Sequence, residues 1–363
     1  MIIKSVELKN YRNFARLCMD FHPHINLLCG ENAQGKTNII ESIYMSSCGK
    51  SHRSSKEREI IEFGCDESHV KSLIEKKDIS YRIDIHLKKD MKKGVAINGI
   101  PIKKISELLG IVSVVLFSPE DLSIIKNGPA ERRKFIDTHL CLLDRIYVHE
   151  LALYNKSLMQ RNRLLKDLSY RDESMATLEI WDEQLIRYGK SIIKIREDFI
   201  DRINKYIRPI HETISSGTEK LELFYENDTT IDSYEEDMRK NRYSDLKYHI
   251  THVGPHRDDI GFEVNGMDIR KYGSQGQQKS AALSLKLSQI DITRSMTGED
   301  PILLLDDVLS ELDIKRQGQL LTAIKDIQTI ITCTSADIFS AHHFHIDREY
   351  RVHDGMIEEI LQR

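Results

Sequence analysis

The sequence predicts an α/β fold with a mixed sheet and an antiparallel helical insertion. Three observations lead to this prediction. A short apolar segment at 24–29 runs directly into the glycine-rich segment 30–37. Residues 70–103 alternate between apolar and polar side chains, which is typical of an antiparallel sheet with one buried face. Residues 178–199 carry apolar side chains at alternating spacings of three and four, which is typical of a helix packed on a partner.

Length and composition limit the class of protein. The chain has 363 residues, of which 40% are hydrophobic and 30% charged, and this suits two domains or one domain with a large insertion. We expect no membrane span, no signal peptide and a cytoplasmic location with reduced thiols, because apolar runs are short and no CxxC pair occurs. His342, His343 and His345 lack partners at metal-ligand spacing, so a metalloenzyme built on histidines is not expected. The net charge of −4 means that binding a polyanion would require local basic patches.

The remaining elements follow from local patterns. Strands are expected at 2–9, 24–29, 302–305 and 329–332, sheet-like patterning near 262–266, a helix from residue 38, and a hairpin turn at Asn98-Gly99. The middle of the chain predicts two antiparallel helices, at 151–168 and 178–199, separated by the polar stretch Tyr170–Ala176. Arg161 occupies one apolar position of their seam. A small helical bundle and a coiled-coil arm both remain open.

The strongest motif is a complete GxxxxGK[ST] loop between the strand at 24–29 and the helix that Asn38 continues. Its residues are Gly30, Glu31, Asn32, Ala33, Gln34, Gly35, Lys36 and Thr37. Glycines allow the backbone to curl around phosphate oxygens, and the helix N-terminus adds aligned N–H groups. We expect Lys36 to neutralise the phosphates of ATP and the Thr37 hydroxyl to bind Mg²⁺.

A matching carboxylate strand occurs later in the chain. Four apolar residues at 302–305 end in Asp306 and Asp307, which predicts a strand buried on both faces beside the strand of the phosphate loop. Asp306 is predicted to hold the Mg²⁺ hydration shell, and Asp307 to orient or deprotonate the attacking water.

A second phosphate-binding cap precedes this strand. Ser274, Gln275, Gly276 and Gln277 stand at the start of an apolar helix at 280–290, and the turn at 310–313 follows the carboxylate strand. A serine and a glycine at a helix N-terminus can bind phosphate. Because one loop already serves one nucleotide, the second cap indicates a γ-phosphate held by another subunit.

These motifs, in this order, resemble those of ABC-type ATPases. The long separation between the phosphate loop and the 274–277 segment, with a helical insertion in it, is similar to the SMC-like chromosome-repair ATPases. Within that group, five phrases resemble the RecF family of bacterial recombination mediators: residues 8–14, 49–53, 117–122, 131–137 and 254–259.

The resemblance implies an ABC-type P-loop ATPase head in three segments: 1–120 and 249–363 form the ATPase lobe, and 121–248 form a helical insertion lobe. It implies that Ser274 and Gly276 of one chain cap the ATP held by Lys36 and Thr37 of another. The resulting ATP-dependent homodimer would clamp duplex DNA at gaps and single-strand/double-strand junctions, and would also meet single strands. With RecO and RecR it would load RecA, supporting repair, replication restart and the SOS response.

Basic residues supply the expected DNA contacts. Candidates are Lys50, His52, Arg53, Lys56, Arg132 and Arg133, which would neutralise backbone phosphates. His52 and Arg53 could serve either DNA or nucleotide. By their place in family-like phrases, Arg12 is expected to contact ATP phosphate and Arg257 to do so or to lie at an interface.

The chain departs from ABC ATPases at three positions. Asp307 stands where most have glutamate, and its shorter side chain reaches the water less well, so we expect slow ATP hydrolysis; the resemblance implies that DNA stimulates it. No glutamine occurs between Asn38 and Met159 to serve as a sensor loop, and Cys333-Thr334-Ser335 replaces the switch histidine. The alternatives are the motor subunit of a transporter or other assembly, which should carry that glutamine, and a small-molecule kinase, which should carry an arginine lid.

Overall fold

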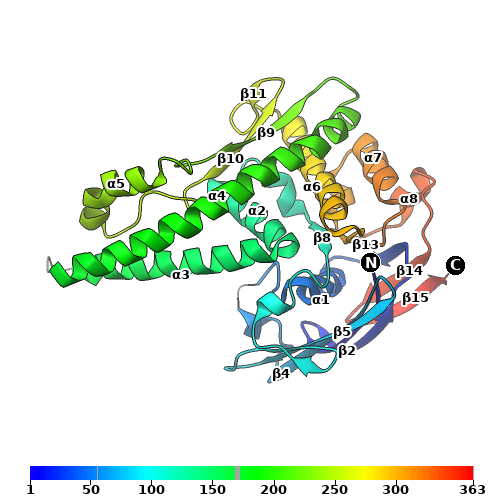
Figure 1. Ribbon diagram of the computed structural model, residues 1–363. Coiled ribbons are helices and arrows are strands. Elements are labelled where there is room, and N and C mark those ends of the chain that lie inside the picture. The colour runs from blue at the N-terminus through cyan, green and yellow to red at the C-terminus, as the bar shows by residue number, and fades with distance from the viewer. Residues whose placement is uncertain (55, 168–171, 363) are drawn as a thin grey trace. The chain divides into compact units, whose positions relative to one another are not determined.

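The computed structural model describes residues 1–54, 56–167 and 172–362. The chain divides into two compact units: Met1–Leu122 with Leu283–Arg363, and Ser123–Ala282. The first unit holds a mixed sheet and an antiparallel sheet, and the second holds long helices beside a small antiparallel sheet, which confirms the predicted fold class (Figure 1). Among the described residues, no helix is long and apolar enough to cross a membrane.

An antiparallel sheet of six strands lies in the first unit. Its order is β2-β1-β4-β5-β6-β7, with β1 at Ile2–Tyr11, β2 at Phe14–Asp20, β4 at Glu67–Lys76, β5 at Ile79–Lys88, β6 at Gly94–Ile97 and β7 at Ile100–Pro101. Val70, Ile83 and Ile85 are buried while their neighbours in sequence reach the solvent face. The alternating pattern therefore predicted this sheet correctly, including the hairpin turn at Asn98-Gly99, where both residues have positive φ.

A second six-stranded sheet carries the phosphate loop. Its order is β15-β14-β3-β13-β12-β8, with β3 at Ile25–Cys29, β8 at Val114–Phe117, β12 at Ile302–Asp306, β13 at Thr329–Cys333, β14 at Arg348–His353 and β15 at Met356–Gln362. All pairs are parallel except β14 with β15. The prediction that the carboxylate strand lies beside the phosphate-loop strand is wrong. Strand β13, buried along its whole length, pairs with both and separates them.

Helix α1, Lys36–Cys48, contacts strands of both sheets, so its buried residues Ile39, Ile40 and Ile43 join one core. The first unit also holds α7 at Ile314–Ile324, α8 at Asp337–Ala341, and short 3-10 helices η1 at Glu57–Glu59, η2 at Ile105–Glu107 and η4 at Val308–Glu311. Two elements cross the unit boundaries, η3 at Pro119–Ser123 and α6 at Gln275–Thr297.

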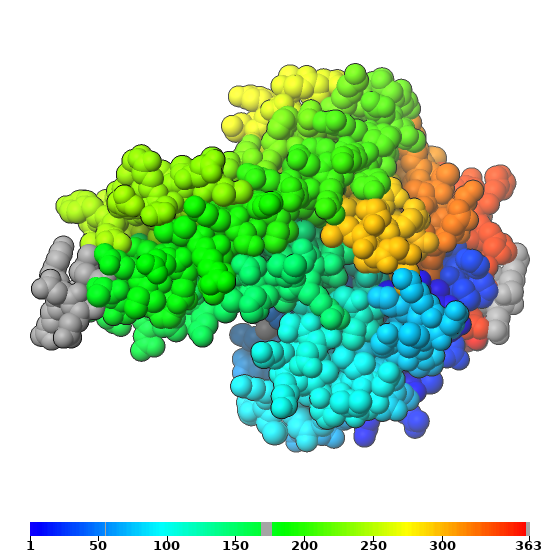
Figure 2. Space-filling model, in the orientation of Figure 1, coloured from blue at the N-terminus to red at the C-terminus, as the bar shows by residue number. Residues whose placement is uncertain are grey.

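The second unit is mainly helical. Its elements are α2 at Pro129–Leu143, α3 at Arg145–Asp167, α4 at Asp172–Ile214, α5 at Tyr234–Tyr248 and a sheet of order β11-β10-β9, with β9 at Leu221–Glu226, β10 at Asp259–Val264 and β11 at Met267–Asp268. Helices α3 and α4 lie side by side, and their side chains form a closely packed surface (Figures 1 and 2, green). Because α2, α5 and β9 also pack on this pair, it belongs to a small bundle.

The seam of the helical pair is buried as predicted at Leu178, Leu185 and Ile192. Arg161 is fully buried in this seam because it forms ion pairs with Asp182 and Asp245, at N–O distances of 2.6 Å each. Leu168 and the first residues of the predicted polar stretch, 170–171, lie outside the described residues.

The predicted insertion began at 121, close to the start of the second unit, but this unit continues past 248 to Ala282. The reason is that β10 pairs with β9 and packs on α2. The 274–277 segment therefore groups with the helical unit, whereas Asp306 and Asp307 group with the phosphate loop. The functional division into three segments remains a prediction.

Candidate nucleotide site

The phosphate loop joins the end of β3 to the start of α1. A Cβ atom added to Gly30 would lie 2.3 Å from the carbonyl oxygen of Val352, and one added to Gly35 would lie 2.7 Å from Asn13. Gly35 also has a φ of 114°. Because Val352 and Asn13 approach the loop so closely, glycine is required at both ends of the loop.

Two contacts hold the loop from outside. The Asn13 side chain donates to the Gln34 carbonyl oxygen at 2.9 Å and accepts from the Asn38 amide at 2.8 Å. The Gln34 side chain accepts a bond from the Asp354 backbone N–H at 2.6 Å. Asn13 and Asp354 were missed as parts of the site. Asn13 could have been found, because it lies in the 8–14 phrase, whereas Asp354 carries no sequence signal.

The Lys36 ammonium group lies inside the curled loop. Its Nζ donates to the carbonyl oxygens of Gly30 and Glu31 at 2.7 and 2.9 Å, and the residue is only 3% exposed. In the described parts of the chain, no carboxylate lies within ion-pair distance of it. A buried cation that only carbonyl oxygens satisfy favours an anionic ligand, so the loop fits a nucleotide phosphate.

Thr37 and Asp306 form the predicted magnesium pair. The Thr37 hydroxyl donates to Asp306 Oδ1 at 2.8 Å, and Thr332 on the intervening strand β13 donates to the same oxygen at 2.9 Å. Burial raises the pKa of Asp306, which is 6% exposed, although both hydroxyl groups counteract this. Mg²⁺ prefers oxygen ligands, and the hydroxyl and carboxylate oxygens of Thr37 and Asp306 lie together at this edge of the sheet. Thr332 also accepts from the Asp307 backbone N–H at 2.8 Å and was missed in the sequence.

Asp307 begins the short helix η4 in a left-handed conformation, with a φ of 52°. Aspartate tolerates this conformation better than most residues. Its side chain is half-buried, and no hydrogen bond or ion pair is recorded for its carboxylate among the described residues. The carboxylate is thus available to a water molecule, as the predicted role requires.

Arg12 does not present a free guanidinium to a phosphate. Its Nη2 and Nε donate to the two oxygens of Glu41 at 2.6 and 2.8 Å, and it also bonds Ser54 and the Glu59 carbonyl. Burial alone would raise the pKa of Glu41, but the bonds from Arg12 and Ser51 outweigh it and lower that pKa. Arg12 therefore fastens helix α1 to Ser54 and Glu59, and the predicted ATP contact finds no support in this geometry.

The basic residues that follow α1 differ in exposure and in charge. His52 packs its ring edge-on against Tyr44 at 5.3 Å, and its buried Nδ1 has no hydrogen-bond partner among the described atoms. Burial lowers the pKa of His52 to about 4, so the ring is neutral near pH 7. Arg53 is exposed and donates to the Asn38 side chain at 3.1 Å, close to the phosphate loop. Lys50 and Lys56 are exposed, whereas His52 is half-buried and neutral, which does not favour its predicted role as a cationic DNA contact.

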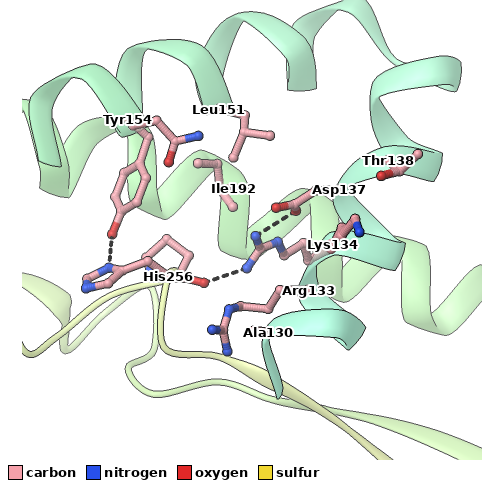
Figure 3. A pocket seen from close by; sticks show the side chains of 12 residues that line it. Ala130, Arg133, Lys134, Asp137, Thr138, Leu151, Tyr154, Ile192 and His256 are labelled. Atoms are coloured by element: carbon pink, nitrogen blue, oxygen red, sulfur yellow. Dashed lines mark hydrogen bonds and ion pairs between the residues drawn. The ribbon is translucent and has the colours of Figure 1, made fainter. Parts of the chain in front are cut away.

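Arg132 is buried and bonds Asp259 through two nitrogens, at 2.6 and 2.8 Å. This pairing holds α2 to β10, so the predicted DNA contact of Arg132 is not supported. Arg133 instead lines a pocket of about 370 Å³ in the helical unit. Figure 3 shows Tyr154 and His256 on one side of this pocket, and Lys134 and Asp137 on the other. Arg133 is half-buried and donates to the Asp258 carbonyl oxygen at 2.7 Å.

The 274–277 segment forms the N-terminus of α6. The Ser274 hydroxyl accepts from the Gln277 N–H at 3.2 Å, and the Gln277 side chain accepts from the Ser274 N–H at 3.0 Å. This reciprocal cap fixes the start of the helix, while Ser274 and Gln275 stay exposed. Arg257 is exposed on the segment that precedes β10, and Thr334 and Ser335 are exposed after β13. The predicted phosphate-capping role of the 274–277 segment and the predicted phosphate or interface role of Arg257 stay predictions.

Known proteins resemble this chain over nearly its whole length. A family model described as the RecF/RecN/SMC N terminal domain matches residues 2–357. The "DNA replication and repair protein RecF" of Agathobacter rectalis is 54% identical over 360 residues, covering 99% of both chains. That of Clostridium perfringens strain SM101 is 43% identical, covering 99% of this chain and all of the other.

Solved structures of RecF and of SMC heads have the same fold as this chain. One described as the recombination mediator protein RecF-ATP in the RecFOR pathway has a TM-score of 0.91 and 37% identity, covering 99% of this chain and 97% of the other. An SMC head bound to the C-winged helix domain of ScpA, at 18% identity and a TM-score of 0.60, shares the fold. The chain belongs to the RecF family of DNA replication and repair proteins, a branch of the RecF/RecN/SMC ATPases.

Proposed function

We propose that this protein is an ATP-dependent DNA-binding recombination mediator. The observation that carries the proposal is the buried Lys36 ammonium beside the Thr37–Asp306 pair. Lys36 would contact phosphate oxygens, and the Thr37 hydroxyl oxygen and Asp306 would hold Mg²⁺, directly or through its water shell, while Thr37 keeps its hydrogen bond to Asp306. Mg²⁺ supplies charge neutralisation on the phosphates when bound.

Hydrolysis at this site is proposed to be slow. Asp307 directly follows Asp306, its carboxylate has no hydrogen-bond or ion-pair partner among the described residues, and its side chain is one methylene shorter than glutamate. A general base must lie within hydrogen-bond reach of the proton that it removes. The protein therefore acts mainly as a switch that binds ATP, hydrolyses it slowly with water and then releases ADP and phosphate.

The exposed cap at 274–277 supports a dimer in which each chain completes the site of the other. Ser274 and the adjacent backbone N–H groups offer donors at a fixed helix N-terminus, which suits the γ-phosphate on a partner's loop. ATP then drives dimerisation because it binds the closed pair better than the separate chains.

The DNA role extends what the relatives' descriptions say. The exposed Lys50, Arg53 and Lys56 follow α1, and Arg133 and Lys134 line the pocket in the helical unit. Such cations bind backbone phosphates without reading sequence. We propose that the dimer clamps DNA at gaps and junctions, and that with RecO and RecR it loads RecA for repair, replication restart and SOS induction.

The experiment is binding of a gapped duplex, with and without ATP and Mg²⁺, by the wild type and by Lys50→Ala/Arg53→Ala/Lys56→Ala. Arg58→Ala is a control, because Arg58 is exposed in the same region. We expect ATP to tighten binding and the triple variant to weaken it, with a shallower dependence on salt. Equal binding with and without ATP would refute the mediator proposal.

A further inference from the structure

A cluster of three metal-ligating side chains lies on the first unit's antiparallel sheet, and the nucleotide site does not use it. Glu67 and His69 stand two residues apart on β4, and His86 lies directly opposite His69 on β5. A β-strand turns alternate side chains to the same face, so all three project from one side of the sheet. Their donor atoms lie within 4.8 Å of one another.

The donor groups of this triad, Glu67, His69 and His86, lie close enough together to meet at one metal ion. The imidazole rings of His69 and His86 stack with centroids 3.8 Å apart, and His86 Nε2 lies 3.1 Å from Glu67 Oε2. Two ligands of a tetrahedral zinc ion, each about 2.1 Å from it, are about 3.4 Å apart. The 3.1 Å separation of His86 Nε2 from Glu67 Oε2 is near this value. The two stacked rings would have to turn out of their nearly parallel planes, so that the lone pairs of both imidazoles point at one ion.

The backbone beneath the triad is rigid. The residues next to the ligands along each strand, Ser68 and Val70 on β4 and Ile85 and Leu87 on β5, are buried. The sheet continues on both sides, with β1 next to β4 and β6 next to β5. Ligands fixed on neighbouring strands lose little conformational entropy when they bind an ion.

Lys88 would compete with a metal ion for the Glu67 carboxylate. Lys88 Nζ lies 3.5 Å from the same Glu67 oxygen that faces His86. A bound cation would displace this exposed ammonium group at small cost, because exposed ion pairs contribute little. Lys9 also lies opposite His69 on β1, so the site is expected to be of moderate affinity.

We propose that Glu67, His69 and His86 bind a divalent transition-metal ion of the kind that imidazole prefers, with zinc as the reference ion. Two imidazoles and one carboxylate leave a fourth position open for water or another ligand. His69 also lines a groove of about 650 Å³ on the same sheet, together with Lys9, Arg16 and Cys18. The site is independent of the proposed nucleotide function.

Calorimetric titration of the nucleotide-free full chain with Zn²⁺ tests this proposal. The wild type should bind one ion, and His86→Gln or His69→Gln should weaken that binding at least tenfold. Lys88→Met should bind several-fold more tightly, because it removes the competitor and keeps the apolar stem. His353→Gln is the matched control, since His353 is an exposed histidine beside an acid, Asp354, outside the triad.

A cobalt spectrum separates the triad from the free cysteines. Co²⁺ bound by imidazole and carboxylate gives visible bands without the near-ultraviolet charge-transfer band of thiolate ligands. Absence of zinc binding, unchanged affinity in both histidine variants, or a thiolate band that they do not alter would overturn the proposal. Circular dichroism checks that each variant is folded, and two independent histidine variants protect against failure of one.

Discussion

The Thr37 hydroxyl donates a hydrogen bond to Asp306 Oδ1 at 2.8 Å, and so joins two motifs that are 269 positions apart in the sequence. Thr332 reaches the same oxygen from the strand between them. The carboxylate is therefore held in place before any cation binds. Such preorganisation reduces the cost of binding, because the ligands are already ordered.

Lys36→Ala is expected to abolish ATP binding, because it removes the one buried cation of the phosphate loop. We predict affinity at least about 100-fold weaker, equivalent to about 2.7 kcal/mol, as for a charged hydrogen-bonding group. Calorimetry with ATP measures it, with Lys50→Ala as control because Lys50 is exposed. If Lys36→Ala bound ATP as tightly as the wild type, the phosphate loop would not be the ATP site.

Asp307→Asn should still bind ATP but accumulate as a dimer, because it retains the fold and loses the group that activates water. Asp307→Glu should hydrolyse ATP faster than the wild type, since the longer side chain reaches the water better. Sedimentation and phosphate release measure the two effects. An asparagine variant that hydrolyses ATP at the wild-type rate would show that Asp307 is not the base.

Arg12→Ala should destabilise the first unit by about 3 kcal/mol, because it leaves the buried Glu41 carboxylate without its main partner. Arg12→Lys should recover part of this loss, and Arg58→Ala should have little effect. Urea unfolding measures all three. Equal stability of Arg12→Ala and the wild type would contradict the fastening role of Arg12.

The Arg12–Glu41 pair also predicts a pH dependence. The pKa of Glu41 is lowered from 4.5 in the folded protein, so its contribution is present above pH 4.5 and is lost as the pH falls through the folded value. The stability difference between the wild type and Glu41→Gln should shrink over that range. A difference that stays constant on acidification would argue against an ionised Glu41.

His52 should titrate near pH 4 in the folded protein, against 6.5 when unfolded. Its folded pKa is depressed, so the unfolded chain binds the proton first and stability falls as the pH drops from 6.5 towards 4. His52→Gln should flatten the stability curve over this range and leave the salt dependence of DNA binding unchanged. Nuclear magnetic resonance of the His52 ring measures the titration directly, and a pKa near 6.5 would refute its burial.

Local patterns predicted the parts of the site that are contiguous in sequence. The phosphate loop, the carboxylate strand and the cap at 274–277 each depend on neighbouring residues, and the structure places them at strand and helix ends as expected. Strand order was not predictable in the same way. A fully apolar strand such as β13 fits any central position of a parallel sheet, so its place between β3 and β12 could not be read from its residues.

Ion pairs between residues far apart in the sequence could not be predicted either. Arg132 was predicted to contact DNA, but its partner Asp259 lies 127 positions away on β10. Likewise, the neutral state of His52 depends on its burial against Tyr44, which a basic-looking sequence does not reveal. Charge in a sequence shows which residues can bind phosphate, whereas folding decides which of them remain exposed.

In the proposed dimer, ATP joins two chains through Lys36 of one and Ser274 of the other. Sedimentation of the wild type with ATP and Mg²⁺, with and without a gapped duplex and beside Ser274→Arg, tests it most directly. We predict that ATP produces a wild-type dimer that binds the duplex more tightly, and that the arginine blocks both. A protein that stays monomeric with saturating ATP, or a Ser274→Arg variant that dimerises as well as the wild type, would contradict the account.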